Sequence, residues 1–277
     1  MVLDWAFAVN IGPSEKAGEK DLVLVTFISE GQNRASGVFR EERVEATGED
    51  VTTMGGQGIY TTQKEYFRDA YRSGVHGWPT EGPTGAILQF LKKMRREGIE
   101  GRFLDIGCGE GRHLIPFARA GFRCEGFDLE PLALERAEGY LRKAGVRRRV
   151  NLRKGDALRL PYPESSFDVI LDSGCFHHIR ISDERRFVRG ILKVLKPGGT
   201  FLLTVFDVNF RHTPDELVHK RRRWLVHRGH YDRFFTAADI RRVFGKEFVV
   251  RELVKEAKGL SHFWHVRMRS RVAGGSG

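Results

Sequence analysis

The fold is decided by FLDIGCGEGRH, residues 103–113, an apolar run that breaks into alternating glycines. The apolar residues 103–106 predict a buried strand, and the glycines predict a tight turn before a helix. Gly107, Gly109 and Gly111 carry no Cβ, so the backbone can take positive φ angles and approach a ligand closely. We therefore expect a nucleotide-like ligand at this turn.

Two other nucleotide-binding motifs do not fit this turn. The dinucleotide motif G-x-G-x-x-G needs glycine at position 112, where the chain has Arg112. The phosphate cradle G-x-x-x-x-G-K-[ST] needs a lysine and a hydroxyl directly after its last glycine, where the chain has Arg112 and His113. The turn therefore argues against a bound NAD or FAD and against ATP hydrolysis.

Residues 105–111 read D-x-G-x-G-x-G and resemble motif I of the class I S-adenosylmethionine-dependent methyltransferases. Further features follow in the order known for that family: Asp128 after the next strand, Gly155-Asp156-Ala157, a strand ending at Asp172, and Leu195-Lys196-Pro197-Gly198-Gly199. The resemblance covers about residues 60–268. It implies a Rossmann-like α/β fold with a seven-stranded, mostly parallel sheet, helices on both faces and an antiparallel last strand.

The resemblance implies S-adenosylmethionine as cofactor, with the glycines passing under its methionine part. Asp128, at a strand tip, can accept hydrogen bonds from both ribose hydroxyls, and Asp156 corresponds to the residue that contacts the adenine amino group. The expected cofactor-binding residues are Trp78, Asp105, Gly107, Cys108, Gly109, Gly111, Asp128, Leu129, Asp156, Ala157, Asp172 and Cys175.

A narrower and looser resemblance concerns the acceptor. Residues 66–83, with Trp78-Pro79 and Gly82-Pro83, and residues 172–178 are similar to the thiopurine- and tellurite-resistance-type small-molecule methyltransferases. In that group the tryptophan region covers the cofactor as a lid, and the residues after strand four border cofactor and acceptor. This similarity implies a small-molecule acceptor such as a thiol or another chalcogen compound.

His177 and His178 are the candidate catalytic residues. A sulfur or selenium nucleophile needs no base. An amine or hydroxyl acceptor is helped by a general base, which these histidines could supply at the carboxyl end of the strand that ends at Asp172. The alternative is that the two histidines cap or pack around the pocket. His178 is also a candidate substrate contact.

The three cysteines, Cys108, Cys124 and Cys175, have neither disulfide nor zinc-type spacing, and we expect no metal site. Cys108 has no base spaced to activate it, which favours a packing role, and we expect Cys124 to lie in the core.

The net charge of +11 is unevenly distributed. Residues 1–60 hold five Lys/Arg and ten Asp/Glu, which leaves +16 for the remainder of the chain. This asymmetry is either a solvated basic surface or a face for an anionic partner, and an RNA methyltransferase is therefore an alternative function. Against base N-methylation, residues 172–175 read Asp-Ser-Gly-Cys where such enzymes carry Asn/Asp-Pro-Pro-Tyr/Phe. A cofactor-binding module without catalytic activity is the third alternative.

We expect residues 59–272 to form the methyltransferase domain. Residues 211–235, rich in arginine and histidine, are expected to be an acceptor-side insertion, either a lid with Tyr231 lining the substrate site, a phosphate-contacting surface or a solvated basic helix. Residues 1–58 are either a hairpin and linker or sequence upstream of a start at Met54, and 273–277 form a flexible tail. The chain has no apolar run of about 18 residues and no basic leader, so we expect a soluble, cytoplasmic protein of unassigned oligomeric state.

Overall fold

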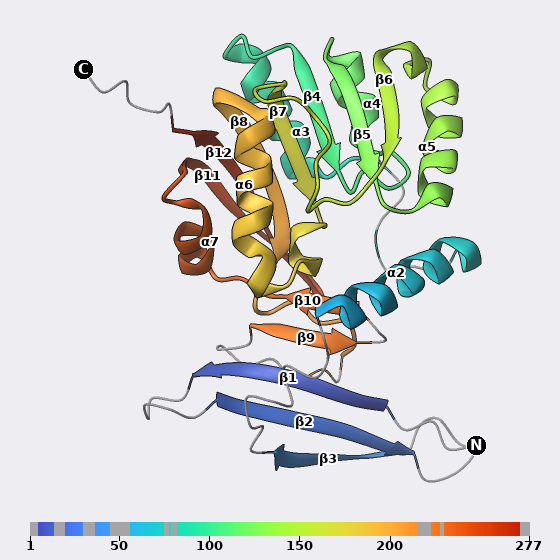
Figure 1. Cartoon of the computed structure of the whole chain (residues 1–277), viewed down its shortest axis with the longest axis vertical. Coiled ribbons are helices and arrows are strands. Elements are labelled where there is room, and N and C mark those ends of the chain that lie inside the picture. Colours follow the sequence, from blue (N-terminus) through green and yellow to red (C-terminus); the bar gives the residue numbers. More distant parts are fainter. Residues whose placement is uncertain are drawn as a thin grey trace.

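The computed structural model describes residues 5–13, 20–29, 37–44, 56–74, 78, 82–214, 216, 223–227 and 230–271 (Figure 1). The expected tail at 273–277 lies outside these residues. Within the described part, no helix is both long and apolar enough to span a bilayer.

A seven-stranded sheet forms the centre of the molecule, in the order β11-β12-β8-β7-β4-β5-β6 (Figure 1). Its strands are β4 (Arg102–Ile106), β5 (Arg123–Asp128), β6 (Val150–Lys154), β7 (Phe167–Ser173), β8 (Leu195–Phe206), β11 (Phe248–Lys258) and β12 (Ser261–Ser270). β4 pairs in parallel with β5 and β7, and the parallel pairing continues to β6 and β8. β12 is antiparallel to both of its neighbours, β8 and β11. The expected fold class is confirmed, including the antiparallel last strand.

Helices cover both faces because side chains alternate along each buried strand. On β4, Phe103 packs with α3 (Gly85–Arg96), α4 (Leu114–Arg119) and α5 (Pro131–Lys143). Leu104 and Ile106 of the same strand point to the opposite face, against α6 (Glu184–Val194) and α7 (Ala237–Phe244). Three single-turn helices complete the domain: η1 (Arg147–Arg149), η2 (Phe176–His178) and η3 (Ile181–Asp183).

Two motifs of the sequence lie next to element boundaries. The helix that follows the glycine turn begins at Leu114, because the turn continues through Gly111, whose N–H donates to the Cys108 carbonyl at 2.9 Å. The Lys-Pro-Gly-Gly run lies inside β8, which begins at Leu195.

A second sheet has the order β10-β9-β1-β2-β3. Its strands are β1 (Trp5–Pro13), β2 (Lys20–Ser29), β3 (Gly37–Val44), β9 (Trp224–His227) and β10 (His230–Arg233). β2 and β3 form an antiparallel pair, as in a hairpin. β1 was not expected from the sequence, and it pairs with β9, for example Val9 with Leu225. The N-terminal strands and the expected insertion therefore share one sheet (Figure 1). The sequence also suggests a linker at 46–58; α2 (Gly56–Ser73) begins inside this stretch, and residues 46–55 lie outside the described part of the chain.

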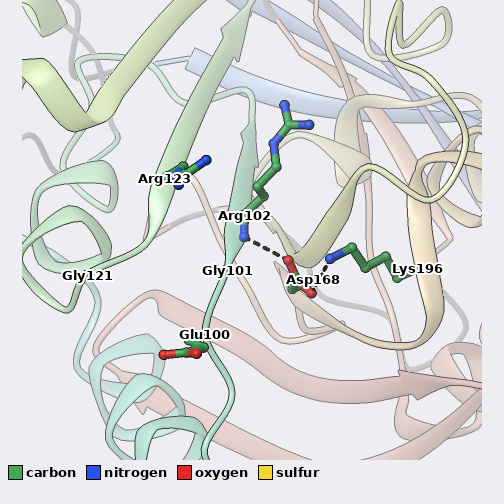
Figure 2. A pocket seen from close by; sticks show the side chains of 7 residues that line it. All are labelled: Glu100, Gly101, Arg102, Gly121, Arg123, Asp168 and Lys196. Atoms are coloured by element: carbon green, nitrogen blue, oxygen red, sulfur yellow. Dashed lines mark hydrogen bonds and ion pairs between the residues drawn. The ribbon is translucent and has the colours of Figure 1, made fainter.

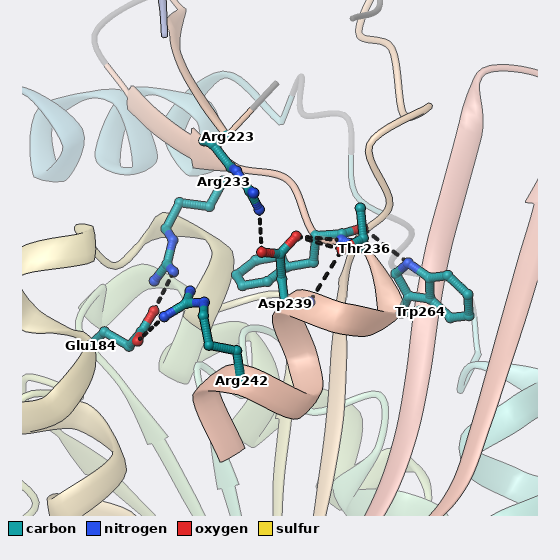
Figure 3. Close-up of polar contacts among 8 residues, drawn as sticks. Glu184, Arg223, Arg233, Thr236, Asp239, Arg242 and Trp264 are labelled. Atoms are coloured by element: carbon teal, nitrogen blue, oxygen red, sulfur yellow. Dashed lines mark hydrogen bonds and ion pairs between the residues drawn. The ribbon is translucent and has the colours of Figure 1, made fainter. Parts of the chain in front are cut away.

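Charged side chains join β10 and the residues near β9 to helices α6 and α7 (Figure 3). Arg233 at the end of β10 donates to Glu184 at 2.6 Å, and the exposed Arg242 reaches the same carboxylate at 3.3 Å. Arg223 pairs with Asp239, which forms a capping box with Thr236 at the start of α7.

Candidate active site

The glycine loop, Gly107–Gly111, leaves the carboxyl end of β4 in a conformation that favours glycine. Gly107, Gly109 and Gly111 have φ angles of 67°, 53° and 82°. A Cβ on Gly107 would lie 2.8 Å from the Cβ of Cys175, and one on Gly109 would lie 2.9 Å from the hydroxyl of Tyr71. The loop is therefore closely packed, and at its three glycines only backbone atoms face a ligand.

Asp128 ends β5 directly beside this loop. Its Oδ2 accepts the Gly109 N–H at 2.8 Å and its Oδ1 accepts the Glu130 N–H at 2.9 Å. Burial raises the pKa of the Asp128 carboxyl, while these backbone hydrogen bonds oppose that shift. A carboxylate has about four acceptor positions, so these contacts leave acceptor capacity for ribose hydroxyls. Leu129, which follows, is half-buried.

Asp105 and Asp172 lie inside the fold. Asp105 is only 1% exposed, and burial raises the pKa of its carboxyl well above the ordinary value. Asp172 accepts the N–H groups of Cys175 and Phe176 at 3.0 and 3.1 Å, which closes the turn after β7, and burial raises its pKa to about 7.

Asp156 and Ala157 follow β6 and are half-buried. Asp156 Oδ1 accepts the Leu158 N–H at 2.8 Å. Together with Asp128, Asp156 offers an accessible carboxylate at the carboxyl edge of the sheet, unlike the enclosed pair of Asp105 and Asp172.

Helix α2 lies by this carboxyl edge of the sheet (Figure 1). Trp78 packs on two aromatic residues of α2. Its ring centroid lies 5.7 Å from that of Phe67 and 5.4 Å from that of Tyr71. Arg136 of α5 donates to the Tyr71 carbonyl at 2.6 Å and pairs with Glu110 of the loop at 2.9 Å. Trp78 is thus linked to the glycine loop through Tyr71, which was not among the expected cofactor-binding residues.

None of the three cysteines is activated. Burial raises the pKa of Cys108, Cys124 and Cys175, and no basic side chain that would favour a thiolate is among the main influences on Cys108 or Cys175. Cys108 and Cys124 belong to the apolar core around α3 and α4, as expected.

A pocket at the opposite edge of the sheet is lined by Glu100, Gly101, Arg102, Gly121, Arg123, Asp168 and Lys196 (Figure 2). Asp168 accepts from the Arg102 N–H at 2.8 Å and from Lys196 Nζ at 2.7 Å. These charges satisfy one another at the amino ends of the strands, so this pocket is separate from the glycine loop.

Residues 103–199 match the family model described as a methyltransferase domain. This part of the chain is a class I, S-adenosylmethionine-dependent methyltransferase domain. The first resemblance drawn from the sequence is thereby confirmed.

Two curated relatives of the methyltransferase domain are norajmaline N-methyltransferase from Rauvolfia serpentina and 27-O-demethylrifamycin SV methyltransferase from Amycolatopsis mediterranei. The chain is 35% identical to the first over 36% of its own length and 34% of the relative, and 39% identical to the second over 38% of each. It therefore spans little more than a third of the length of these relatives.

Solved structures share the fold over a larger part of the chain. The 1,6-didemethyltoxoflavin-N1-methyltransferase of Burkholderia thailandensis, solved with its substrate and S-adenosylhomocysteine, aligns with 94% of this chain and 98% of its own at a TM-score of 0.61. The sequence identity is 18%, so this likeness concerns the fold alone.

The two candidate histidines of the methyltransferase domain lie in different surroundings. His177 is buried and its ring stacks on Phe206, with centroids 3.7 Å apart. Burial lowers the pKa of His177 well below the usual value, so its ring is neutral. Nδ1 of His178 lies 2.9 Å from Asp232 Oδ1 and 3.1 Å from the Tyr231 carbonyl.

Asp232 on β10 lies close to two further histidines. His212 and His230 each place Nε2 2.9 Å from its Oδ2. Although burial opposes ionisation, the three neighbouring histidines hold the pKa of Asp232 well below its usual range. Tyr231 meets this cluster through its backbone: its carbonyl contacts His178 and its N–H donates to Gln63 Oε1 at 3.1 Å.

The sequence alone did not indicate a set of further site residues: Tyr71, Gln63, His212, His230 and Asp232. Helical spacing of Phe67, Ala70 and Tyr71 is a signal that could have indicated α2 and its buried face. The histidine cluster has no such signal, because its members come from three places: His178 follows β7, His212 follows β8, and His230 and Asp232 lie on β10.

Proposed function

We propose that the whole protein transfers the methyl group of S-adenosylmethionine to a small molecule. The observation that carries the proposal is the glycine loop at the end of β4, with positive φ angles and with the Asp128 carboxylate beside it. The loop offers backbone without side chains, Asp128 offers acceptors to the ribose, and Asp156 offers one to the adenine amino group. Trp78, Leu129, Ala157 and Cys175 complete the proposed cofactor site.

S-adenosylmethionine, when bound, supplies a methyl group already activated by its sulfonium. The protein therefore has to align the acceptor and exclude water. The aromatic side chains of Phe67, Tyr71 and Trp78 are suited to cover the loop as a lid, because the Tyr71 hydroxyl already approaches Gly109.

His178 is the proposed general base for an acceptor N–H or O–H. A proton on Nδ1 can be donated to Asp232 Oδ1 or to the Tyr231 carbonyl, which leaves the lone pair of Nε2 free to take the acceptor proton. His177, stacked on Phe206 and enclosed, is better suited to support the ring of His178.

An amine or hydroxyl acceptor agrees with this arrangement and with the names of the N- and O-methylating relatives. A thiol or another chalcogen acceptor needs no base and stays a hypothesis from the sequence.

The test is transfer of labelled methyl from S-adenosylmethionine by the full chain to a panel of small amines, hydroxyl compounds, thiols and RNA. We expect label in an amine or hydroxyl compound, and His178→Gln should slow this transfer by about 10²–10⁴-fold. If instead a thiol is labelled, and His178→Gln does not slow that transfer, His178 is not a general base in the reaction. Label in RNA would support the alternative of an RNA methyltransferase, and tight cofactor binding without transfer to any acceptor would support an inactive module.

A further inference from the structure

Two histidines and a carboxylate converge at one point outside the proposed cofactor site. Asp232 has no exposed surface, and its Oδ2 lies 2.9 Å from Nε2 of both His212 and His230. The three donor atoms all lie within 4.8 Å of one another. The donors come from two separate segments: His212 follows β8, whereas His230 and Asp232 lie on β10.

We propose that His212, His230 and Asp232 bind a divalent transition-metal ion, for which zinc is the best match. Two imidazole nitrogens and one carboxylate oxygen are donors that zinc takes at about 2.0–2.2 Å. Such donors around a tetrahedral ion stand ~3.4 Å apart, so the observed 2.9 Å contacts need only a small outward movement. The cysteine spacing that argued against a zinc site has no bearing on this histidine set.

The same ring nitrogen of each histidine faces the same carboxylate oxygen. Hydrogen bonding alone would require both Nε2 atoms to carry protons and to share Oδ2 of Asp232. A metal ion instead uses the lone pairs of both Nε2 atoms and the charge of the carboxylate, which suits a buried position.

Neighbouring side chains hold the three donors in place. The ring of Tyr66 stacks on His230 with centroids 4.1 Å apart, and Phe210 packs edge-on against His212 at 5.1 Å. His178 contacts the other oxygen of Asp232 at 2.9 Å and thereby orients the carboxylate. The side chain of His212 is 19% exposed and offers a route for the ion.

Three protein donors leave at least one coordination position for water or for another ligand. A bound ion would fasten the segment after β8 to β10 on the acceptor side of the domain. This proposal concerns ion binding and does not depend on the proposed methyl transfer.

The experiment uses the full chain without an affinity tag, freed of metal with a chelator and dialysed. Zinc chloride is titrated by calorimetry, and cobalt(II) is added while the visible absorption is recorded. We expect one equivalent of zinc and cobalt bands typical of a low-coordinate nitrogen and oxygen site. His212→Ala and His230→Ala should each weaken binding by at least about 10–100-fold.

His262→Ala is the matched control, because the His262 ring contacts the Gly259 carbonyl rather than the cluster; it should bind zinc as the wild type does. If buried His230→Ala fails to fold by circular dichroism, the more exposed His212 variant decides. The proposal is overturned if neither ion binds saturably, or if folded His212→Ala binds zinc as tightly as the wild type. Cofactor affinity measured on the same samples should not change with His212→Ala, so the two proposals fail separately.

Discussion

At the scale of single residues, Asp128 shapes the loop and can also bind a ligand. Its carboxylate holds Gly109 and Glu130 by their N–H groups and retains acceptor positions for ribose hydroxyls. We expect Asp128→Ala to weaken S-adenosylmethionine binding by about 1–3 kcal/mol, because a charged hydrogen-bond acceptor is lost. Isothermal calorimetry on the full chain measures this change.

Glu125 provides the control for this substitution. It lies on the same strand and contacts Asn151 and Arg102, so Glu125→Ala should leave the cofactor affinity unchanged. Equal affinities of Asp128→Ala and wild type would remove Asp128 from the cofactor site.

Gly107 tests whether the loop needs glycine for both its conformation and its packing. Its φ is 67°, and a Cβ would meet Cys175 at 2.8 Å, so Gly107→Ala should cost about 1–3 kcal/mol in stability or in cofactor affinity. Gly139→Ala, in α5 where nothing lies within 4 Å of the added Cβ, should instead stabilise the chain by about 0.5–1 kcal/mol. Urea unfolding and cofactor titration of both variants check this, and a harmless Gly107→Ala would contradict the described packing.

At the scale of elements, the N-termini of α3 and α4 meet at His113. The N–H of Thr84 donates to His113 Nε2 at 3.3 Å, so this nitrogen must be unprotonated in the folded state. Burial lowers the pKa of His113 well below 6.5, and the positive charge of Arg112 adds to this effect. The unfolded chain therefore binds an additional proton below about pH 6.5.

The consequence is a loss of stability on acidification. His113 should reduce the free energy of unfolding by up to about 1.4 kcal/mol for each pH unit below 6.5. His113→Gln keeps an acceptor for Thr84 but does not titrate, so its stability should fall less steeply between pH 6 and 5. Urea unfolding of both proteins across this range gives the two slopes, and equal slopes would show that His113 already takes up a proton in the folded state.

The elements that could be predicted from sequence are those whose signals are local. The apolar run before Gly107 marks β4, and Thr236 with Asp239 marks the start of α7 through their reciprocal capping hydrogen bonds. The pairing of β1 with β9 joins opposite parts of the chain, and His212 meets Asp232 although neither a helical nor a strand repeat relates their positions. Only the topology brings such residues together, so spacing in the sequence could not indicate them.

At the scale of the whole molecule, Arg233 connects the sheet that holds the N-terminal strands to the methyltransferase domain. It ends β10, is 3% exposed and lies near the rings of Phe176 and Phe235, at 5.0 and 4.8 Å. Its guanidinium donates to Glu184 at the start of α6 (Figure 3). Both side chains of this ion pair are buried, so water cannot solvate the charge that is left if one partner is removed.

We expect Arg233→Met to lower the free energy of unfolding by about 3 kcal/mol, because among the described residues it leaves the buried Glu184 carboxylate with Arg242 as its one charged partner. Arg242→Met is the matched control, since the Arg242 side chain is 60% exposed and such pairs contribute at most about 1 kcal/mol. Adding Glu184→Gln to Arg233→Met should recover part of the loss, because the unpaired charge is removed while the side-chain volume is kept. Urea unfolding of the four proteins measures these contributions to stability, and an Arg233→Met variant as stable as Arg242→Met would mean that the pair does not hold β10 to α6.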